Sequence, residues 1–293
     1  MKAPPPPTDL ASLATLACIL EASAPKPGNV SPGRPFLDMS YSDFVSSAIA
    51  AGPELARAGE RPLGATILAA ILATRRWTSA NTNLGLVLLL APLVMAVRRA
   101  GNLREALGAV LRETTVEDAR DVYAAIREVG PGGMGSVRGQ DIAAEPTVSL
   151  YQAMQLAADR DSIAREYVTD FVTTFEYGVP LLRSARGEGL AWDAATVETF
   201  LGLLSRVPDT LIARKLGTAA AELTSRQAAV VLGAGGVRTP EGRSALAAFD
   251  ADLRDPQNSR NPGTTADLTA AALFVVLLLD GWSTDRSRTS RAQ

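Results

Sequence analysis

The sequence predicts an all-α protein, and three observations carry this prediction. Apolar residues recur at helical spacing along most of the 293 residues. The sustained apolar–polar alternation of half-buried strands is absent from the sequence. Apolar residues make up 47% and charged residues 20% of the chain, which is ordinary for a globular protein with a sizeable core. We expect a single compact domain of roughly a dozen helices over residues 1–283, with a buried central helix and a polar tail over residues 284–293.

The first half of the chain contains six predicted helices before a glycine-rich loop. Thr8 and Asp9 can cap the first, and Arg75 and Arg76 suit the negative end of the third helix dipole. The fourth is the most apolar, but it is too short to span a bilayer and contains Pro92, so we expect it in the core. The six ranges are Leu10–Glu21, Ser42–Ala58, Leu63–Trp77, Leu84–Arg99, Leu103–Arg112 and Val116–Val129.

The second half contains seven further predicted helices. The last is apolar over Leu268–Leu279 and is flanked by Asp267 and Asp280, so it also fits a buried helix better than a membrane span. The seven ranges are Val148–Ala158, Ser162–Tyr177, Ala194–Val207, Thr210–Leu223, Arg226–Ala234, Pro240–Arg254 and Thr265–Leu279.

The composition excludes several kinds of chemistry and partner. The sequence has no histidine, which excludes Ser-His-Asp and Cys-His catalysis and histidine-bound zinc. A net charge of -2 argues against a general nucleic-acid binder. The single cysteine, Cys18, excludes an intramolecular disulfide and fits a reducing compartment. The proline-rich start lacks the apolar core of a signal peptide, so we expect a cytoplasmic protein with no membrane partner.

Three long irregular segments are candidate ligand-binding loops. They are Pro25–Ser40, Gly130–Thr147 and Asp255–Thr264, and each places a charged residue beside glycine or proline. Long loops inside a compact domain are usually functional or disordered. Lys26 lies between two prolines of the first loop and Arg138 lies in the second. Both cations are candidates for phosphate binding, although Lys26 is equally compatible with an ordinary surface lysine.

Three predicted helices begin with polar clusters. These clusters are Asn81-Thr82-Asn83, Pro208-Asp209-Thr210 and Asn261–Thr265. A helix N-terminus attracts anions because its first N–H groups are free and its dipole is positive. Each cluster alone is more simply a helix cap, but the three together favour one shared site. Arg214 and Lys215 follow one turn into the second of these helices.

Four carboxylates lie at loop–helix junctions: Glu21, Asp38, Asp209 and Asp267. Carboxylates gathered in this way can hold Mg²⁺ with a polyphosphate or act as a catalytic base. For Asp267 the simpler alternative is an acidic residue favoured by the helix dipole in a first turn.

Several short motifs occur in one order along nearly the whole chain. They are Glu21–Val30 (EASAPKPGNV), Asp38-Met39, Asp43-Phe44, Asn81-Thr82 with Gly85, Arg138-Gly139, Asp209-Thr210 with Arg214, and Asn261–Leu268 (NPGTTADL). Together they resemble the triphosphoribosyl-dephospho-CoA synthase family, helical enzymes that make the prosthetic-group precursor of citrate lyase and malonate decarboxylase.

The resemblance implies a Mg²⁺-dependent transfer of the triphosphoribosyl group of ATP to 3′-dephospho-CoA, with release of adenine. It also implies catalytic or metal-binding roles for Glu21, Asp38, Asp209 and Asp267. The residues expected to bind substrate or nucleotide are Lys26, Gly28, Asn29, Asn81, Thr82, Gly85, Arg138, Thr210, Arg214, Gly263, Thr264 and Thr265.

The chain departs from the family pattern at one motif. Where enzymes of the family usually read Asn-Thr-His-Lys-Gly, this chain reads Asn-Thr-Asn83-Leu84-Gly. The departure resembles a divergent branch of the family and favours two alternatives. One is an enzyme that acts on another nucleotide or phosphorylated cofactor precursor, for example in one-carbon or pterin cofactor metabolism. The other is a non-catalytic helical binding protein. The alanine-rich helix surfaces also favour a homodimer.

Overall fold

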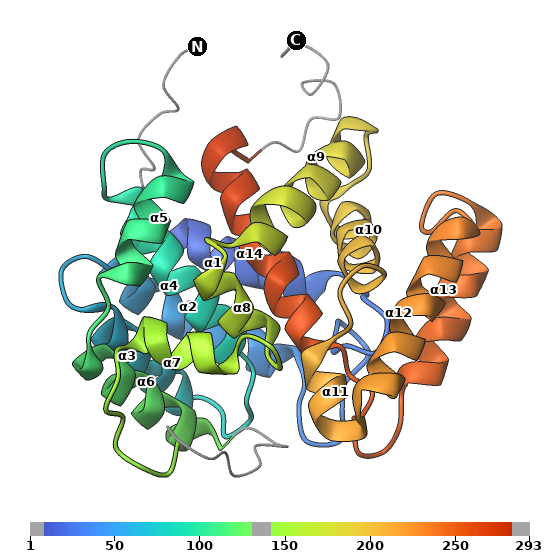
Figure 1. Cartoon of the computed structure of the whole chain (residues 1–293). Helices are drawn as coiled ribbons and strands as arrows, with labels where there is room; N and C mark the ends of the chain where they lie inside the picture. Colours follow the sequence, from blue (N-terminus) through green and yellow to red (C-terminus); the bar gives the residue numbers. More distant parts are fainter. Residues whose placement is uncertain (1–8, 131–141, 283–293) are drawn as a thin grey trace. The chain divides into compact units, whose positions relative to one another are not determined.

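The computed structural model describes residues 9–130 and 142–282 (Figure 1). These residues form fourteen α-helices and one π-helix, and contain no β-strand. The only β-type pairings among them are two isolated bridges, Ser31 with Arg34 and Ala58 with Arg61. The all-α prediction is therefore confirmed for the described part of the chain.

The helices group into two compact units. Unit 1 contains Ala17–Tyr41 and the chain from Thr173 onward, and unit 2 contains Ser42–Val172 together with the start of the first helix. The first helix, α1 (Leu10–Ser23), passes from unit 2 into unit 1. The predicted boundary between a domain of residues 1–283 and a tail stays a prediction.

Unit 2 is a bundle around the apolar helix α4 (Leu84–Val97), of which eleven residues are buried. Pro92 lies inside α4 and cannot donate the hydrogen bond that the carbonyl of Leu88 would normally receive. The buried hydroxyl of Tyr167 donates to that carbonyl at 2.7 Å instead. The other helices of the unit are α2 (Tyr41–Ala56), α3 (Leu63–Arg75), α5 (Leu103–Arg112), α6 (Val116–Val129), α7 (Leu150–Ala157) and α8 (Ser162–Val168).

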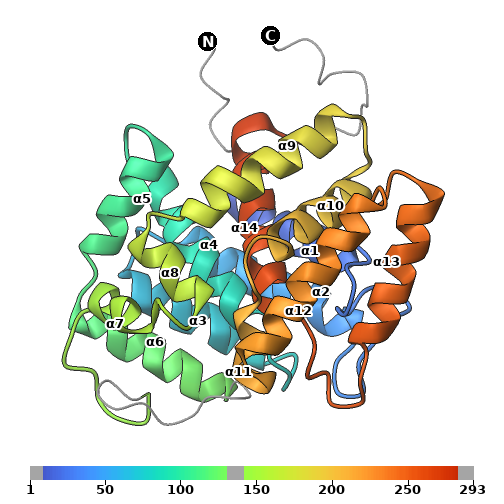
Figure 2. The same cartoon turned by 45° about the vertical axis from the view of Figure 1, so that its right-hand side comes forward.

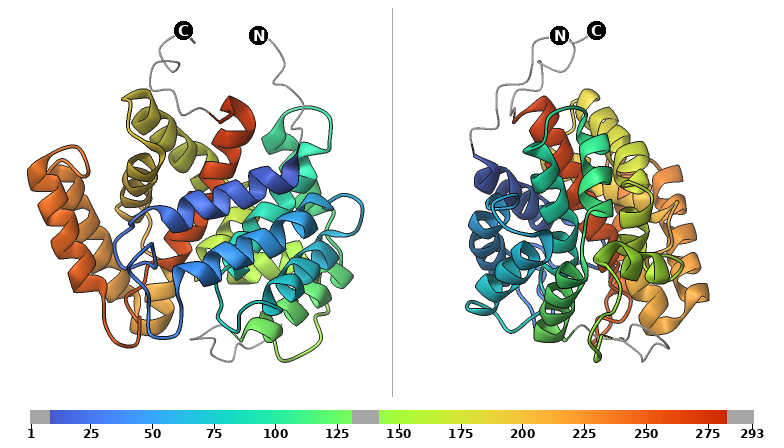
Figure 3. Two further views of the ribbon diagram at one scale, coloured as in Figure 1. Left: turned by 180° about the vertical axis from the view of Figure 1, so that it is seen from behind. Right: turned by 60° about the vertical axis from the view of Figure 1, so that its left-hand side comes forward.

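Unit 1 is built around α14 (Gly263–Asp280), of which thirteen residues are buried. By length and composition alone α14 could cross a membrane, but 72% of its apolar window is buried within the protein, as in the core helix of a globular fold. Figure 3 shows the unit from two further sides. The other elements are the π-helix η1 (Thr173–Gly178) and α9 (Val179–Gly187), α10 (Trp192–Leu204), α11 (Thr210–Leu216), α12 (Thr218–Gly233) and α13 (Pro240–Leu253).

The predicted helix Ser162–Tyr177 is wrong. Helix α8 ends at Val168, and Asp170 and Phe171 adopt left-handed backbone angles, with φ of 51° and 58°. Burial of Phe171 and hydrogen bonds from two arginines to Asp170 hold this break in place, and Arg112 donates at 2.9 Å. No glycine or proline lies in this stretch to indicate the break in the sequence.

The predicted division between Thr210–Leu223 and Arg226–Ala234 is also wrong. The break lies at Gly217, whose φ of 90° ends α11, and α12 then runs without interruption from Thr218 to Gly233. Helix α9 was not predicted. Hydrophobic periodicity does not reveal the position of a break such as the one at Gly217, because it reports which face of a helix is apolar and not where the backbone turns.

Candidate functional site

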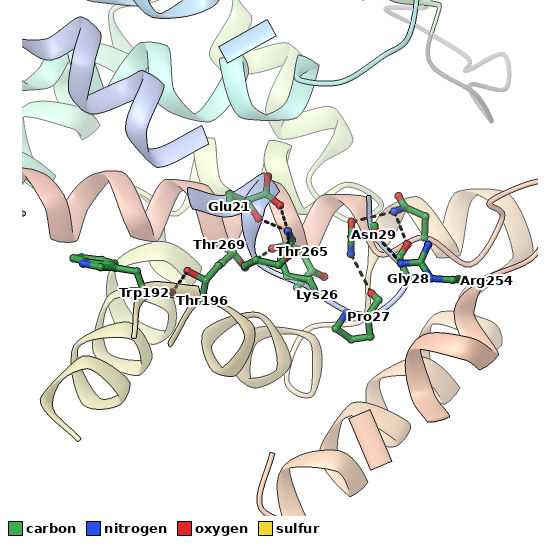
Figure 4. A network of polar contacts seen from close by, with 12 residues as sticks. Glu21, Lys26, Pro27, Gly28, Asn29, Trp192, Thr196, Arg254, Thr265 and Thr269 are labelled. Atoms are coloured by element: carbon green, nitrogen blue, oxygen red, sulfur yellow. Dashed lines mark hydrogen bonds and ion pairs between the residues drawn. The ribbon is translucent and has the colours of Figure 1, made fainter. Parts of the chain in front are cut away.

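The loop after α1 folds back onto the end of that helix. The ammonium of Lys26 forms an ion pair with the carboxylate of Glu21 at 2.8 Å, and both side chains are almost fully buried, at 1% and 4% exposed. The same ammonium donates to the backbone carbonyls of Glu21 and Ala24 (Figure 4). These carbonyls belong to the C-terminal end of α1, where a cation is favoured by the helix dipole. All three N–H bonds of Lys26 therefore have protein acceptors within reach.

The next part of the loop is clasped to α13. The backbone N–H of Gly28 donates to Asp250 Oδ1 at 2.8 Å, and Arg254 donates to Asp250 Oδ2 at 3.0 Å. Arg254 also donates to the carbonyl of Asn29 at 2.7 Å, a pairing visible in Figure 4. Gly28 has a φ of 71°, and a Cβ atom there would lie 2.8 Å from the Cβ of Leu253. The motif needs glycine at this position for both its backbone angle and its packing.

The first and third predicted loops meet through Asn261. Its side-chain amide donates to the carbonyl of Gly28 at 2.9 Å and to the side-chain oxygen of Asn29 at 3.0 Å. Asn29 in turn donates to the carbonyl of Pro27 at 3.1 Å. Two segments more than two hundred residues apart in the sequence thus share one hydrogen-bond network in unit 1.

Asp209 joins the start of α11 to the start of α14. Its Oδ1 accepts from the N–H groups of Leu211 and Ile212 at 2.9 and 3.1 Å, and its Oδ2 accepts from the N–H and hydroxyl of Thr265, both at 2.8 Å. Burial raises the pKa of Asp209 above its ordinary value, and these hydrogen bonds oppose the rise. We call this carboxylate junction the Asp209 clamp. The hydroxyls of Thr210 and Thr264 lie 3.3 Å apart beside it.

Asp38, Arg214 and Lys215 form the exposed edge of this region. The ammonium of Lys215 donates to the carbonyl of Asn258 at 2.9 Å, and the side chain of Asn258 lies 3.4 Å from Asp38. Partial burial lowers the pKa of Lys215, while the nearby carboxylates of Asp255, Asp209 and Asp38 oppose the change. Cations and carboxylates from three segments therefore lie at one accessible edge.

The Asn81–Gly85 motif lies in unit 2 and is engaged with its neighbours. The hydroxyls of Thr82 and Ser47 are 2.6 Å apart, and the amide of Asn83 donates to the hydroxyl of Thr74 at 2.9 Å. Asn81 is exposed, and its side-chain oxygen accepts from the N–H of Leu84 at 3.3 Å. The cap of α4 is thus made by Asn81, while Thr82 and Asn83 fasten its start to α2 and α3.

The sequence and the fold both match one known family. A sequence model of the ATP:dephospho-CoA triphosphoribosyl transferase family matches residues 7–286. The chain belongs to this family.

Similar proteins agree with this assignment. A 2-(5''-triphosphoribosyl)-3'-dephosphocoenzyme-A synthase from Klebsiella pneumoniae is 33% identical over 97 residues, which are 33% of this chain and 34% of that protein. A Pseudomonas fluorescens protein that carries the same name with the qualifier "probable" is 32% identical over 105 residues, 36% of this chain and 35% of its own. The matched region therefore spans about a third of the length of these relatives.

A solved structure extends the likeness over most of the chain. It is a crystal structure of an Archaeoglobus fulgidus protein with the provisional name triphosphoribosyl-dephospho-CoA synthase. The two are 31% identical with a TM-score of 0.63, and the match covers 82% of this chain and all of the other.

The family motifs fall into two groups in the structure. The larger group lies in unit 1 and contains Glu21, Lys26, Gly28, Asn29, Asp38, Asp209, Thr210, Arg214, Gly263, Thr264, Thr265 and Asp267. The smaller lies in unit 2 and contains Asp43, Phe44, Asn81, Thr82 and Gly85. Arg138 lies outside the described residues.

The four predicted carboxylates differ in accessibility. Glu21 and Asp209 are buried, Asp267 is half-buried on α14, and Asp38 is exposed with its carboxylate 3.4 Å from the side chain of Asn258. The described residues contain no group of three or more Asp, Glu, Cys or His side chains that could hold a metal ion. Mg²⁺ usually needs only one or two carboxylates when it arrives with substrate phosphates. The residues therefore fit an ion carried by a polyphosphate, and the assignment of its ligands stays a prediction.

Two residues of the network had no distinguishing signal in the sequence. Asp250 and Arg254 are four positions apart and read as an ordinary i,i+4 ion pair on a helix. Their bonds to Gly28 and Asn29 appear only when the fold brings α13 to the loop after α1.

Proposed function

We propose that the protein transfers the triphosphoribosyl group of ATP to 3′-dephospho-CoA and releases adenine. Its membership of the transferase family supports this, together with the names of its relatives. The structural observation that carries the proposal is the network of unit 1. It gathers three segments that are far apart in the sequence: the loop that carries Lys26 and Asp38, the start of α11 at Asp209, and the stretch that leads into Thr265.

The accessible edge provides groups suited to this chemistry. The reaction breaks the N-glycosidic bond at the anomeric carbon of ATP, and adenine leaves with the electron pair of that bond and takes up a proton. A ribose hydroxyl oxygen of dephospho-CoA bonds to the anomeric carbon and gives its proton to a base, so the protons balance. A carboxylate near the anomeric carbon stabilises the oxocarbenium-like transition state, as in glycoside hydrolysis. We assign these two roles to Asp38, which lies at the accessible edge, and to Asp267, which is half-buried on α14. We assign Glu21 and Asp209 to positioning, because their oxygens already hold Lys26 and Thr265.

The cations of the same edge suit the triphosphate. Arg214 and Lys215 are exposed on one turn of α11, where they can form charge-assisted bonds to phosphate oxygens. Mg²⁺ would neutralise phosphate charge, with Asp38 or Asp267 as its protein ligand. A direct phosphate contact by Lys26 requires its ammonium to exchange at least one protein acceptor for the substrate.

The proposal is tested by product analysis. Purified protein is incubated with ATP, Mg²⁺ and dephospho-CoA, free adenine is measured by chromatography, and the CoA product is identified by its mass. We expect adenine and product in equal amounts, and loss of both with Asp38→Asn. Asp159→Asn, an exposed aspartate of unit 2, is the matched control and should leave the rate unchanged. No adenine above a boiled control, at high protein concentration, would refute the proposal.

A different substrate is the second candidate, and Leu84 is the observation that favours it. The position where the family usually has lysine is an 8%-exposed leucine packed at the start of α4, and the preceding Asn83 is bonded to Thr74. Neither side chain can supply the charge of the usual pair. If nucleotides and phosphorylated cofactor precursors are screened by thermal shift, stabilisation by ATP–Mg²⁺ with dephospho-CoA favours the first function. Stabilisation by another compound alone favours the second, and no response at all favours a non-catalytic binding protein.

We also propose a cytoplasmic location with neither nucleic-acid nor membrane partners. The buried free thiol of Cys18, the net charge of -2 and the burial of α14 support this. Fractionation of cells that express the tagged protein tests the location, and recovery with membranes would contradict it.

A further inference from the structure

Helix α12 exposes two large apolar side chains on its outer face. Its inner face is packed in the core of unit 1 through Ala221, Thr224, Ala228 and Val231. On the opposite face, Leu223 is 46% and Val230 is 69% exposed. Glu222 and Arg226 are the only charged residues between Thr218 and Gly233, and small residues complete the outer face: Ala219, Ala229 and Gly233.

The neighbouring helix α13 provides a contrast within the same unit. Its exposed positions include Glu241, Arg243 and Asp252, and it exposes no large apolar side chain. Figure 2 shows α12 and α13 side by side, with α12 toward the viewer. Single exposed apolar residues are normal on a protein surface, but Leu223 and Val230 lie two turns apart on one face, with the stem of Arg226 between them and small residues beside them, and together these form a mixed stripe.

The stripe is self-complementary when two copies of α12 run antiparallel. If a two-fold axis passes between Thr224 and Ser225, Ala219 of one copy faces Val230 of the other, so a small residue meets a large one. Leu223 then faces the aliphatic stem of Arg226. Small residues at these positions let helices approach to about 8 Å between their axes.

The charges of Glu222 and Arg226 also favour the antiparallel arrangement. Glu222 and Arg226 are 4.0 Å apart in one chain, with both side chains more than half exposed, so their own ion pair is weak. In the antiparallel pair each arginine lies about 1.5 Å along the helix axis from the level of the other copy's glutamate, and about 4.5 Å from the level of the other arginine, so the opposite charge is the nearer one. In a parallel pair Glu222 would face Glu222 and Arg226 would face Arg226, and like charges repel.

We propose that the outer face of α12 binds the same face of a second copy of this chain in an antiparallel, two-fold arrangement. The charge pattern selects a second copy as the occupant because it is complementary to itself. One helix pair buries less than the roughly 1,200–2,000 Å² of a standard stable interface, so we expect a dimer that dissociates on dilution. This inference is independent of the proposed activity.

Disulfide trapping tests the arrangement directly. In the double variant Ala219→Cys/Val230→Cys, the two new thiols of one chain are about 16 Å apart along the helix and cannot bond to each other. Under mild oxidation we expect covalent dimers, seen on a non-reducing gel. The control is Ala219→Cys alone, whose thiols would meet only in a parallel pair. The wild-type chain, with the buried Cys18, measures the background.

Each outcome decides the proposal. Dimers from the double variant at ten or more times the yield of the single variant support it. Equal yields from both variants would overturn the antiparallel arrangement. Background yields from both, with a monomer in sedimentation analysis at every concentration, would overturn the interface itself.

A second set of variants tests the energetics of the same face. Val230→Asp should weaken dimerisation at least tenfold in sedimentation equilibrium without lowering the melting temperature, because the side chain is exposed. Leu156→Asp replaces a 60%-exposed leucine of α7 and should leave dimerisation unchanged. Arg226→Glu should weaken the dimer, and adding Glu222→Arg should restore it. Equal effects of Val230→Asp and Leu156→Asp would contradict the proposed face.

Discussion

Asp209 in unit 1 and Asp118 in unit 2 use the same device in two different settings. Each is a buried aspartate whose two oxygens join the starts of two helices. Asp209 joins α11 to α14, and Asp118 accepts from the N–H of Gly64 on α3 at 2.7 Å and from Thr115 at the start of α6 at 2.8 Å. In both units a carboxylate satisfies N–H groups that a helix start leaves free.

The settings of the two clamps differ. Asp209 lies beside the loops that carry the family motifs and near Lys215, whereas the partners of Asp118 carry none of those motifs. A similar use of a buried carboxylate therefore supports a candidate site in one unit and packing in the other, although Asp209 is the N-cap of α11 and Asp118 is the third residue of α6. The motif context, rather than the clamp, distinguishes function from stability.

The largest expected effect comes from removing each clamp. Asp209→Ala leaves the buried N–H groups of Ile212 and Thr265 without an acceptor and should lower the free energy of unfolding by about 3 kcal/mol. Asp118→Ala leaves one buried N–H group, that of Gly64, and should lower it by about 2 kcal/mol. Urea unfolding measures this loss. Only Asp209→Ala should also abolish stabilisation by ATP–Mg²⁺ at temperatures where both variants are folded. Loss of that response in Asp118→Ala as well would break the distinction between the two units.

The second effect concerns the loop after α1, which carries Gly28 and packs against α13. Gly28→Ala combines a φ of 71° with a contact of 2.8 Å to the Cβ of Leu253, and should lower the free energy of unfolding by about 3 kcal/mol. Gly33→Ala is the matched control, because its φ is 76° but no atom lies within 4 Å of the new Cβ. It should cost only about 1 kcal/mol of backbone strain. Equal losses in urea unfolding would mean that packing against α13 does not constrain the motif.

The third effect compares two asparagines of the unit 2 motif. Asn83→Ala removes a buried hydrogen bond to Thr74 and should cost about 1 kcal/mol, measured by urea unfolding. Asn81→Ala removes one exposed cap and should cost about 0.5 kcal/mol. If the Asn81 variant instead weakens ATP–Mg²⁺ binding without a change in stability, the exposed asparagine is a ligand contact and not only a cap.

The smallest effect at neutral pH concerns Cys18 in unit 1. Burial, together with the charges of Glu21 and Asp267, raises the pKa of this thiol from 9.0 to about 12. A raised pKa stabilises the folded state fully below pH 9, and this contribution is lost as the pH rises toward 12. The difference in unfolding free energy between the wild type and Cys18→Ala should therefore be constant from pH 7 to 8 and fall above pH 9. A constant difference up to pH 11 would show that the thiol is not held in this environment.

Much of the fold followed from periodicity, because helix formation and burial of one face are local properties of the sequence. The buried helices around Val94 and Leu273 were predicted from runs of apolar residues, and both are in the core. The break at Asp170 and Phe171 was not predicted. It depends on Arg104 and Arg112, which approach from another helix.

The candidate site, like the fold, has some features that the sequence determines and others that only the tertiary structure determines. The sequence alone determined which residues carry the family motifs, including Lys26, Asp209 and Thr265, since motif order is written in the chain. Only the tertiary structure decided that Lys26 is buried against Glu21 and that Asp209 holds Thr265. It also decided that Asp250 and Arg254 clasp the loop. Burial and hydrogen-bond partners depend on segments distant in the sequence, and those distances exist only after the helices have packed.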